Sequence, residues 1–114
     1  MKQAANGGRE ISVLICRGDL NAASMVRIKN TLSRLLHRNR KRMILDLAKA
    51  RRADFSGLGI LMDRIQKIRA MRGDIRIINM RPEVSQTFDK AGVNRLVETF
   101  PSKHDALRSY QLAS

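Results

Sequence analysis

The 114-residue sequence predicts an α/β domain with a mixed sheet of four or five strands and about four helices. Two observations predict this class. Short apolar, β-branched runs alternate along the chain with longer segments whose apolar residues recur at helical spacing, in the order β-α-β-α-β-α-β-α. Alternation of this kind is typical of a largely parallel sheet with right-handed crossovers. The length allows one domain, and a hydrophobic fraction of 43% allows one buried core without disulfides or metals.

Four apolar runs are predicted to be strands, over residues 10–17, 43–47, 74–79 and 96–100. The first two have nearly continuous apolar centres, "VLIC" and "MILDL", which is typical of strands covered on both faces. Residues 1–9 lack periodicity and contain Asn6-Gly7-Gly8, so we expect a flexible N-terminal tail there and the folded domain over residues 10–114.

Four helices are predicted between and after these strands, because apolar residues recur there every three or four positions. Asn21 suits the N-cap of the first helix, Pro82 suits the first turn of the third, and Gly92 suits its end. The side chains expected in the core are Val13, Ile15, Ile28, Leu32, Leu35, Ile44, Leu45, Leu61, Ile65, Ile77, Phe88 and Leu96.

The chain is strongly basic, with 23 Lys and Arg against 10 Asp and Glu and a formal charge of +13. Such a field favours acidic partners, which are nucleic acid, anionic lipid or an acidic protein surface. One basic group, residues 38–42, precedes the second strand, and another, residues 49–52, follows it. A five-residue strand spans roughly 16 Å, so the two groups lie at opposite ends of the sheet. Aromatic residues make up only 4% and no reader motif is present, so we expect no specific binding of nucleic acid.

The single cysteine, Cys16, lies in an apolar run, which predicts a buried and inert thiol in a reducing compartment. The first ten residues contain no apolar stretch of the kind found in signal peptides, and no run approaches the length of a membrane span. We therefore expect a cytoplasmic protein without membrane insertion.

Catalytic and metal-binding patterns are lacking in the sequence. Asp54 has no second carboxylate, His or Cys nearby at acid–base or metal-ligand spacing, and His37 and His104 lie far apart. The stretch "ADFSGLGIL" lacks the lysine and spacing of a phosphate loop and the flanking glycines of a nucleophile elbow. We expect no enzymatic activity, no cofactor and no metal.

Four pieces of the chain, in order, resemble one known family. They are "RGDLN", "MILDLAKARRADFSGLGIL", "RGDIRIINMRPEVSQTFDKAGVNRL" and "FPSKHDAL". Each piece alone is unspecific, but the ordered set, which spans about residues 10 to 110, is similar to the STAS domain. This family contains bacterial anti-sigma factor antagonists and the tails of sulphate transporters. The resemblance implies a non-enzymatic module that binds an anti-sigma factor or a kinase-like switch partner and so regulates bacterial transcription.

The resemblance also implies where a partner binds. In the antagonists, the serine directly after the loop aspartate is phosphorylated by the partner kinase. Asp54 matches that aspartate, and Phe55, which has no hydroxyl group, occupies the acceptor position. The implied partner-binding residues are Asp19, Asn21, Asp54, Phe55, Ser56, Gly57 and Leu58.

Two of these residues have alternative interpretations. Ser56 either caps the second predicted helix by accepting a backbone N–H bond, which the cap preference favours, or is a relocated phosphoacceptor. Phe55 is either a core side chain or an exposed interface anchor. Two other functions are alternatives to the binding of an anti-sigma factor. The chain is an accessory STAS subunit of a lipid or anion transport complex or, as the less favoured alternative, a nucleic-acid-binding protein. We expect a monomer or weak dimer.

Overall fold

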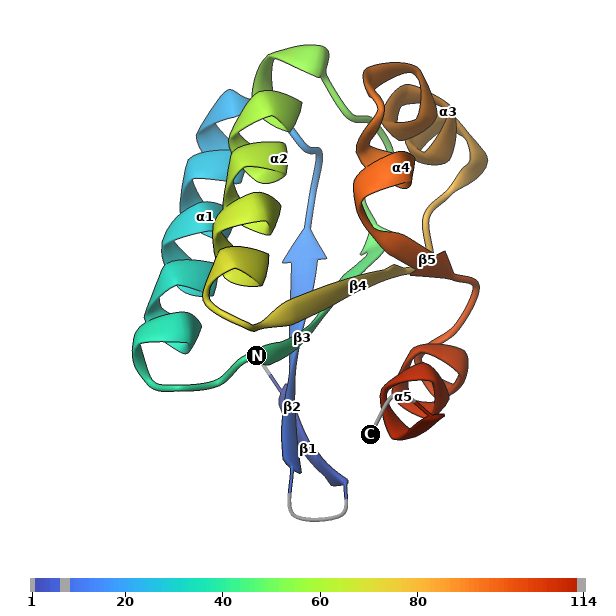
Figure 1. Cartoon of the computed structure of the whole chain (residues 1–114). Coiled ribbons are helices and arrows are strands. Elements are labelled where there is room, and N and C mark those ends of the chain that lie inside the picture. Colours follow the sequence, from blue (N-terminus) through green and yellow to red (C-terminus); the bar gives the residue numbers. More distant parts are fainter. Residues whose placement is uncertain (1, 7–8, 113–114) are drawn as a thin grey trace.

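The structure is a computed structural model that describes residues 2–6 and 9–112, with side chains from Glu10 onward. Figure 1 shows the order of its elements. They are β1 (Lys2–Asn6), β2 (Arg9–Arg17), α1 (Ala22–His37), β3 (Arg42–Lys49), α2 (Phe55–Ala70), β4 (Asp74–Ile78), α3 (Pro82–Ala91), α4 (Val93–Leu96), β5 (Glu98–Phe100) and α5 (Lys103–Leu112).

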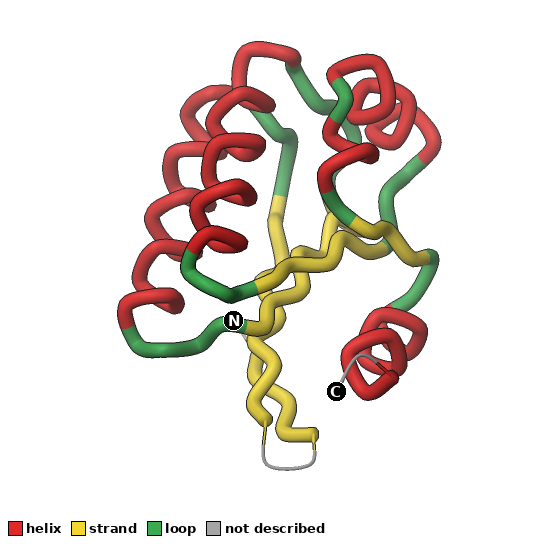
Figure 2. The backbone as a smooth tube through the Cα atoms, in the orientation of Figure 1, coloured by secondary structure: helices red, strands yellow, loops and turns green. Residues whose placement is uncertain are grey.

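The strands form one sheet in the order β1-β2-β3-β4-β5. The four predicted strands correspond to β2, β3, β4 and β5, which run parallel to one another, as the alternating pattern predicted. β1 adds to the outer edge of β2 in the antiparallel direction. Figure 2 shows the sheet as a twisted ribbon of strands with helices on either side.

Two elements differ from the sequence prediction. The tail expected over residues 1–9 contains β1, which pairs Lys2–Asn6 with residues 9–13 of β2, while residues 1, 7 and 8 lie outside the described residues. The second difference is α4, a single helical turn that makes five helices in the described part of the chain. Gly92 ends α3 with φ at 86°, in the left-handed region that glycine favours, and the chain then re-enters a helix. β5 therefore begins at Glu98 and not at Leu96.

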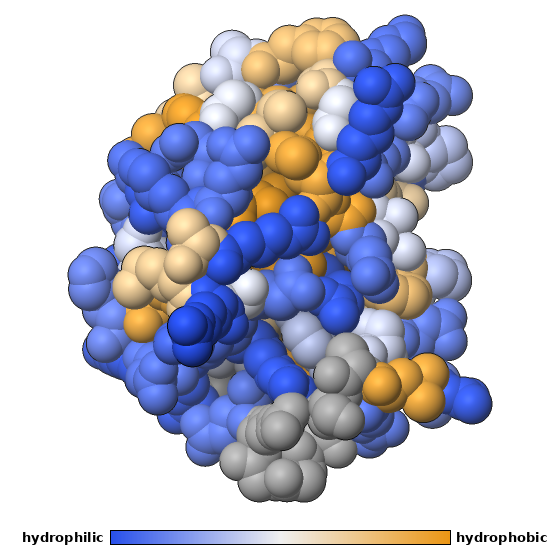
Figure 3. All heavy atoms as spheres, viewed as in Figure 1, coloured by the Kyte–Doolittle hydropathy of each residue, from blue (hydrophilic) through white to orange (hydrophobic). Residues whose placement is uncertain are grey.

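The helices cover the two faces of the sheet unequally (Figure 1). Figure 3 shows the same side of the molecule with all its atoms, where hydrophilic residues surround a smaller apolar area. Helices α1, α2, α3 and α4 pack on one face, where alternate β3 side chains such as Met43, Leu45 and Leu47 join the larger core cluster. On the other face Ile44 joins a smaller cluster with Ala106 and Tyr110 of α5. Right-handed crossovers between successive neighbouring strands place their connecting helices on the same face, which explains this arrangement.

The predicted core is largely correct. Ten of the twelve expected side chains are buried, and Ile15 and Leu96 are half-buried. Cys16 is also buried, and desolvation, helped by the charge of Asp46, raises the pKa of its thiol to about 12. A thiol with so high a pKa has almost no thiolate at neutral pH, so its chemistry is inert, as predicted.

One edge of the sheet gathers the segments that the sequence singled out. Because β2, β3 and β4 are parallel, their carboxyl ends meet at one edge, and α1, α2 and α3 begin there (Figure 1). We call this the carboxyl-terminal edge. It carries the turn 19–21 and the start of α2. Among the described residues, none of the helices combines the length and apolar content of a membrane span.

Candidate functional site

Backbone hydrogen bonds join the two turns in which the partner-binding residues were predicted. Leu20 and Ala53 form an isolated parallel bridge. The Leu20 N–H donates to the carbonyl of Arg52 at 2.9 Å, and the Asp54 N–H donates to the carbonyl of Leu20 at 2.8 Å. The Arg52 N–H also donates to Oδ1 of Asp19 at 3.2 Å. The segments around residues 19–21 and 54–58, about 35 positions apart in sequence, therefore form one connected surface.

The turn before α1 is fixed by a reciprocal cap. The Ser24 N–H donates to Oδ1 of Asn21, the Asn21 N–H donates to Oγ of Ser24, and Ser24 Oγ donates to the carbonyl of Asp19, each at 2.9 Å. The predicted N-cap at Asn21 is thus confirmed, and two N–H groups of the turn are satisfied within it. This arrangement holds the polar side of the turn in one conformation.

The start of α2 lies against this turn, and Gly57 makes the contact possible. A Cβ atom on residue 57 would come within 2.7 Å of Cγ of Met25 and 2.9 Å of the carbonyl oxygen of Asn21. These separations are shorter than carbon atoms tolerate. A residue without a side chain is therefore required where the first turn of α2 crosses the start of α1.

The capping interpretation of Ser56 is wrong. Helix α2 begins at Phe55, and Asp54 holds the N-cap position with extended φ and ψ of −93° and 142°, although its side chain makes no cap hydrogen bond. Ser56 is the second residue inside the helix, where its hydroxyl lies beyond the cap position. Its side chain is exposed.

Phe55 is exposed, so the interpretation of Phe55 as a core residue is also wrong. The side chain is 59% exposed at the first position of α2. Gly57 and Leu58, by contrast, are buried, and Leu58 is only 1% exposed. Leu58 was predicted to touch a partner, but its side chain is buried in the core, because it lies at helical spacing from Leu61 and Ile65 on the inner side of α2. The exposed members of the predicted set are Asp19, Asn21, Asp54, Phe55 and Ser56, which we call the Phe55 surface.

A group of arginines at the same edge was missed as a unit by the sequence analysis. Arg51 and Arg52, which follow β3, and Arg81, which follows β4, line one open hollow together with Pro82 and Glu83. Nε of Arg81 donates to the carbonyl of Ala48 at 3.1 Å, which ties Arg81 to the end of β3. We call this the arginine hollow. The sequence could have indicated this hollow, because the residues that follow two neighbouring parallel strands meet at one edge of the sheet.

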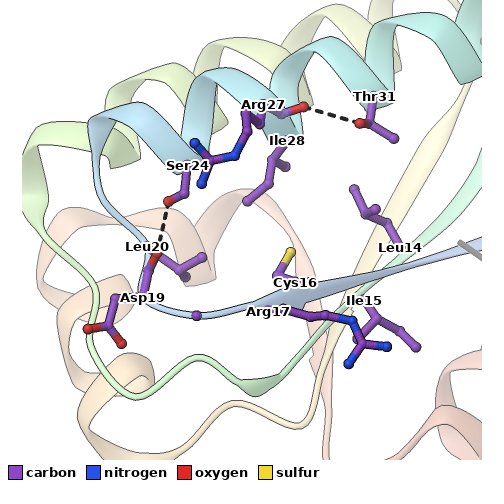
Figure 4. A pocket seen from close by; sticks show the side chains of 11 residues that line it. Leu14, Ile15, Cys16, Arg17, Asp19, Leu20, Ser24, Arg27, Ile28 and Thr31 are labelled. Carbon is purple, nitrogen blue, oxygen red and sulfur yellow. Dashed lines mark hydrogen bonds between the residues drawn. The ribbon is translucent and has the colours of Figure 1, made fainter.

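A small cavity of about 170 Å³ lies beside the Asp19 turn, between β2 and α1 (Figure 4). Leu14, Cys16 and Ile28 point toward it, and the hydrogen bond from Ser24 to Asp19 lies at one end. Its inner wall is apolar, and its only thiol is the inert Cys16. The cavity offers no acid–base pair to the Phe55 surface.

Groups that could bind a metal are also lacking in the described residues, since no three His, Cys, Asp or Glu side chains come together there. The polar contacts of the Phe55 surface are structural. Asp19 and Asn21 accept backbone N–H bonds from Arg52 and Ser24. The arrangement offers a ring, two carboxylates, an amide and a hydroxyl to the solvent, which suits recognition of another molecule more than catalysis.

Comparison with solved structures identifies the same fold in several proteins. A Thermotoga maritima protein described as a candidate anti-sigma factor antagonist superposes with a TM-score of 0.79 at 16% identity, covering 95% of this chain and 92% of its own. The Bacillus anti-sigma factor antagonist SpoIIAA, in its unphosphorylated form, gives 0.70 at 17% identity and covers 99% and 98%. The STAS domain of a Vibrio cholerae SulP transporter gives 0.70 at 24% identity and covers 92% and 84%.

These superpositions establish a shared fold, and the match of the sequence to a family profile establishes the family. The profile of the STAS domain matches residues 3–106, which is nearly the whole chain and includes most of β1, both joined turns and the arginine hollow. The chain belongs to the STAS domain family.

Proposed function

We propose that this chain is a non-enzymatic regulatory module that antagonises an anti-sigma factor or a kinase-like switch partner in the bacterial cytoplasm, and that it binds this partner through the Phe55 surface. The observation that carries the proposal is the exposure of Phe55 on a rigid, joined pair of turns. Burying a Phe side chain in an interface contributes about 1.5–3 kcal/mol, and aromatic anchors in fixed surroundings are typical of binding hot spots.

The surroundings of Phe55 support binding. Backbone bonds between Leu20, Arg52 and Asp54 hold the loop before a partner arrives. A preorganised surface loses little conformational freedom on association, so more of the contact energy appears as affinity. The polar groups of Asp19, Asn21, Asp54 and Ser56 surround the ring and give a polar rim to an apolar centre, as protein interfaces commonly have.

The proposal differs from a phosphorylation switch at the usual position. Phe55 cannot accept a phosphoryl group, so the roughly −1.5 to −2 charges that phosphate adds at neutral pH cannot appear there to repel a partner. Ser56 is the neighbouring hydroxyl and is exposed in the first turn of α2. We propose that partner binding persists in the presence of kinase and ATP, unless Ser56 takes the phosphate.

The experiment that tests the proposal is photocrosslinking in the native cell. Phe55 is replaced by the photoreactive analogue p-benzoylphenylalanine, and Met71 is replaced in a matched control. Met71 is also a large apolar side chain, 50% exposed, but it lies at the opposite end of α2. We expect a single protein, identified by mass spectrometry as an anti-sigma factor or switch kinase, to crosslink at position 55 and not at 71. Equal crosslinking from both positions would reject the Phe55 surface.

A second candidate function is an accessory STAS subunit of a lipid or anion transport complex. The observation that favours it is the 24% identity with the SulP transporter domain, which exceeds the 16–17% found for the two antagonist structures. The same crosslinking experiment separates the candidates, because a membrane transport protein captured at position 55 would support this function over the first.

A further inference from the structure

The arginine hollow contains cations that the fold does not use. In the described part of the chain, the guanidinium groups of Arg51 and Arg52 form no hydrogen bond or ion pair, and both side chains are exposed. Some cations elsewhere are paired, since Lys67 contacts Asp63 at 3.3 Å and Arg69 contacts Asp74 at 3.4 Å. Keeping two like charges side by side without carboxylate partners has an electrostatic cost, which an acidic ligand would remove.

The surrounding backbone adds to the positive potential. Helices α1 and α2, each 16 residues long, begin at this edge, and neither has an acidic residue in its first turn. The carboxylate of Asp54 at the N-cap of α2 offsets part of one dipole, whereas the N-cap of α1 is the neutral Asn21. Glu83 of α3 is the one carboxylate that lines the hollow, against three arginines. Asp19 and Asp54 lie on the adjoining Phe55 surface, and Asp19 accepts the backbone N–H of Arg52. The lining of the hollow itself therefore carries three cations against one carboxylate.

The hollow and the Phe55 ring are close enough for one ligand. Arg52 and Phe55 are three positions apart, so their Cα atoms are separated by at most about 11 Å. Arg81 belongs to the same hollow through its bond to the Ala48 carbonyl. A single extended or helical segment could therefore place one apolar side chain on Phe55 and carboxylates on the arginines.

We propose that the partner docks an acidic protein segment in the arginine hollow, with its carboxylates paired to Arg51, Arg52 and Arg81 and an apolar residue packed on Phe55. This inference rests on the proposed partner-binding function and names the chemistry of that partner. Guanidinium groups bind carboxylates with two parallel hydrogen bonds, which gives orientation as well as attraction. The arginines flank an apolar ring at one end of the sheet and do not form a continuous track, which favours a short protein segment over a nucleic-acid backbone.

The test is an amide NMR titration of the full chain with a blocked hexaglutamate peptide, with hexaglutamine as the neutral control, at about 50 mM and about 300 mM salt. We expect hexaglutamate to shift the amide signals of residues 51–56 and 81–83 first, and hexaglutamine to shift none. The double variant Arg51→Glu/Arg52→Glu should bind hexaglutamate about tenfold more weakly.

The matched control is the double variant Arg38→Glu/Arg108→Glu, which lowers the formal charge by the same four units from +13 at two exposed positions away from the hollow. We expect this control to change the affinity for hexaglutamate by less than about twofold. Shifts that spread evenly over the surface, or equal losses in both double variants, would overturn the site. Tighter binding of a DNA duplex or of phosphatidylglycerol vesicles than of hexaglutamate at the same amides would overturn the carboxylate assignment.

The purified crosslinked partner distinguishes this inference from the function on which it rests. Loss of partner binding in Phe55→Asp together with full binding in Arg51→Glu/Arg52→Glu would overturn the acidic segment and leave the proposed function standing. Full binding in both variants would reject both. We expect partner binding to be lost both in Phe55→Asp and in Arg51→Glu/Arg52→Glu, and to be retained in full in Arg38→Glu/Arg108→Glu.

Discussion

Gly57 of α2 and Asn21 of the turn before α1 are in such close contact that a Cβ atom at residue 57 would lie 2.9 Å from the Asn21 carbonyl oxygen. This contact brings the two helix starts together beneath the Phe55 surface. The exposed ring of Phe55 and the capped turn of Asn21 are consequently parts of one rigid body, which is what a preorganised binding surface requires.

The first prediction tests this contact. Gly57→Ala should lower the free energy of unfolding by about 1–3 kcal/mol, because the added methyl group overlaps Met25 and the Asn21 carbonyl. Gly59→Ala is the matched control, since a Cβ there meets nothing within 4 Å. It should raise stability by about 0.5–1 kcal/mol through helix propensity. Urea denaturation measures both changes, and equal effects of the two substitutions would show that the helix starts do not constrain each other.

The second prediction concerns how α5 is held on the sheet. The Tyr110 hydroxyl donates to the carbonyl of Met43 at 2.7 Å and accepts its N–H at 3.2 Å, in a buried position. Tyr110→Phe keeps the ring under the guanidinium of Arg76, 4.2 Å away, but removes both bonds. We expect a loss of about 1–2 kcal/mol in urea denaturation. Leu112→Ala, at an exposed position of α5, should change stability by less than about 0.5 kcal/mol. An equally stable Tyr110→Phe would contradict the anchoring role.

The third prediction concerns the pH dependence of Cys16. Burial raises the pKa of its thiol from an ordinary 9.0 to about 12, so the folded state keeps the proton where the unfolded state loses it. The contribution of this group to stability is therefore fully present below pH 9 and declines as the pH rises from about 9 to 12. Its reaction with a disulfide reagent at pH 8 should be slow in the folded protein and rapid in urea. Rapid labelling of the folded protein would show that the thiol is exposed.

The fourth prediction concerns the phosphoacceptor position. Phe55→Ser should keep the fold, because the replaced ring is exposed, and should create a hydroxyl that a cognate switch kinase phosphorylates. Mass spectrometry after incubation with the crosslinked kinase and ATP measures the phosphate. Wild-type protein should remain unmodified under the same conditions. Stoichiometric phosphate on wild-type Ser56, with loss of binding, would show that the switch lies one residue further along the chain.

Much of this structure could be predicted from the sequence, because the signals are local. The apolar runs of β2, β3 and β4 and the helical spacing of Ile28, Leu32 and Leu35 depend on burial, which leaves a periodic pattern. The cap at Asn21 was predictable for the same reason, since it depends on residue type and position.

The elements that were missed depend on pairing between distant segments. β1 has the sequence "KQAAN", without β-branched or aromatic residues, and its pairing with β2 is made by backbone groups that any sequence provides. An arginine such as Arg76 is expected at the surface, yet only 5% of it is exposed. Its burial is tolerated because Asp74 pairs with it and the ring of Tyr110 in α5 lies beneath it. The contact with Tyr110 that helps to compensate for the burial of this charge joins residues far apart in the chain, so it cannot be recognised in the sequence.

The candidate site was likewise predictable where it depends on local patterns and not where it depends on contacts between distant segments. The joined turns were predictable from the family resemblance, but the position of Ser56 inside α2 follows from a helix start that is three residues earlier than the apolar stripe indicates. Leu58 lies at helical spacing from Leu61 and Ile65, so its burial follows from the apolar stripe and not from the resemblance. The arginine hollow combines Arg81 with Arg51 and Arg52 across two loops. No local pattern joins these residues.

The central claim is that Phe55 anchors the partner, and calorimetric titration of the purified crosslinked protein with three forms of the chain tests it most directly. Phe55→Asp removes the apolar anchor and adds a charge, and we expect it to weaken binding by more than about 2 kcal/mol. Met71→Asp makes the same chemical change at the other end of α2 and should bind as the wild type does. Unchanged affinity in Phe55→Asp, or an equal loss in both variants, would contradict the claim.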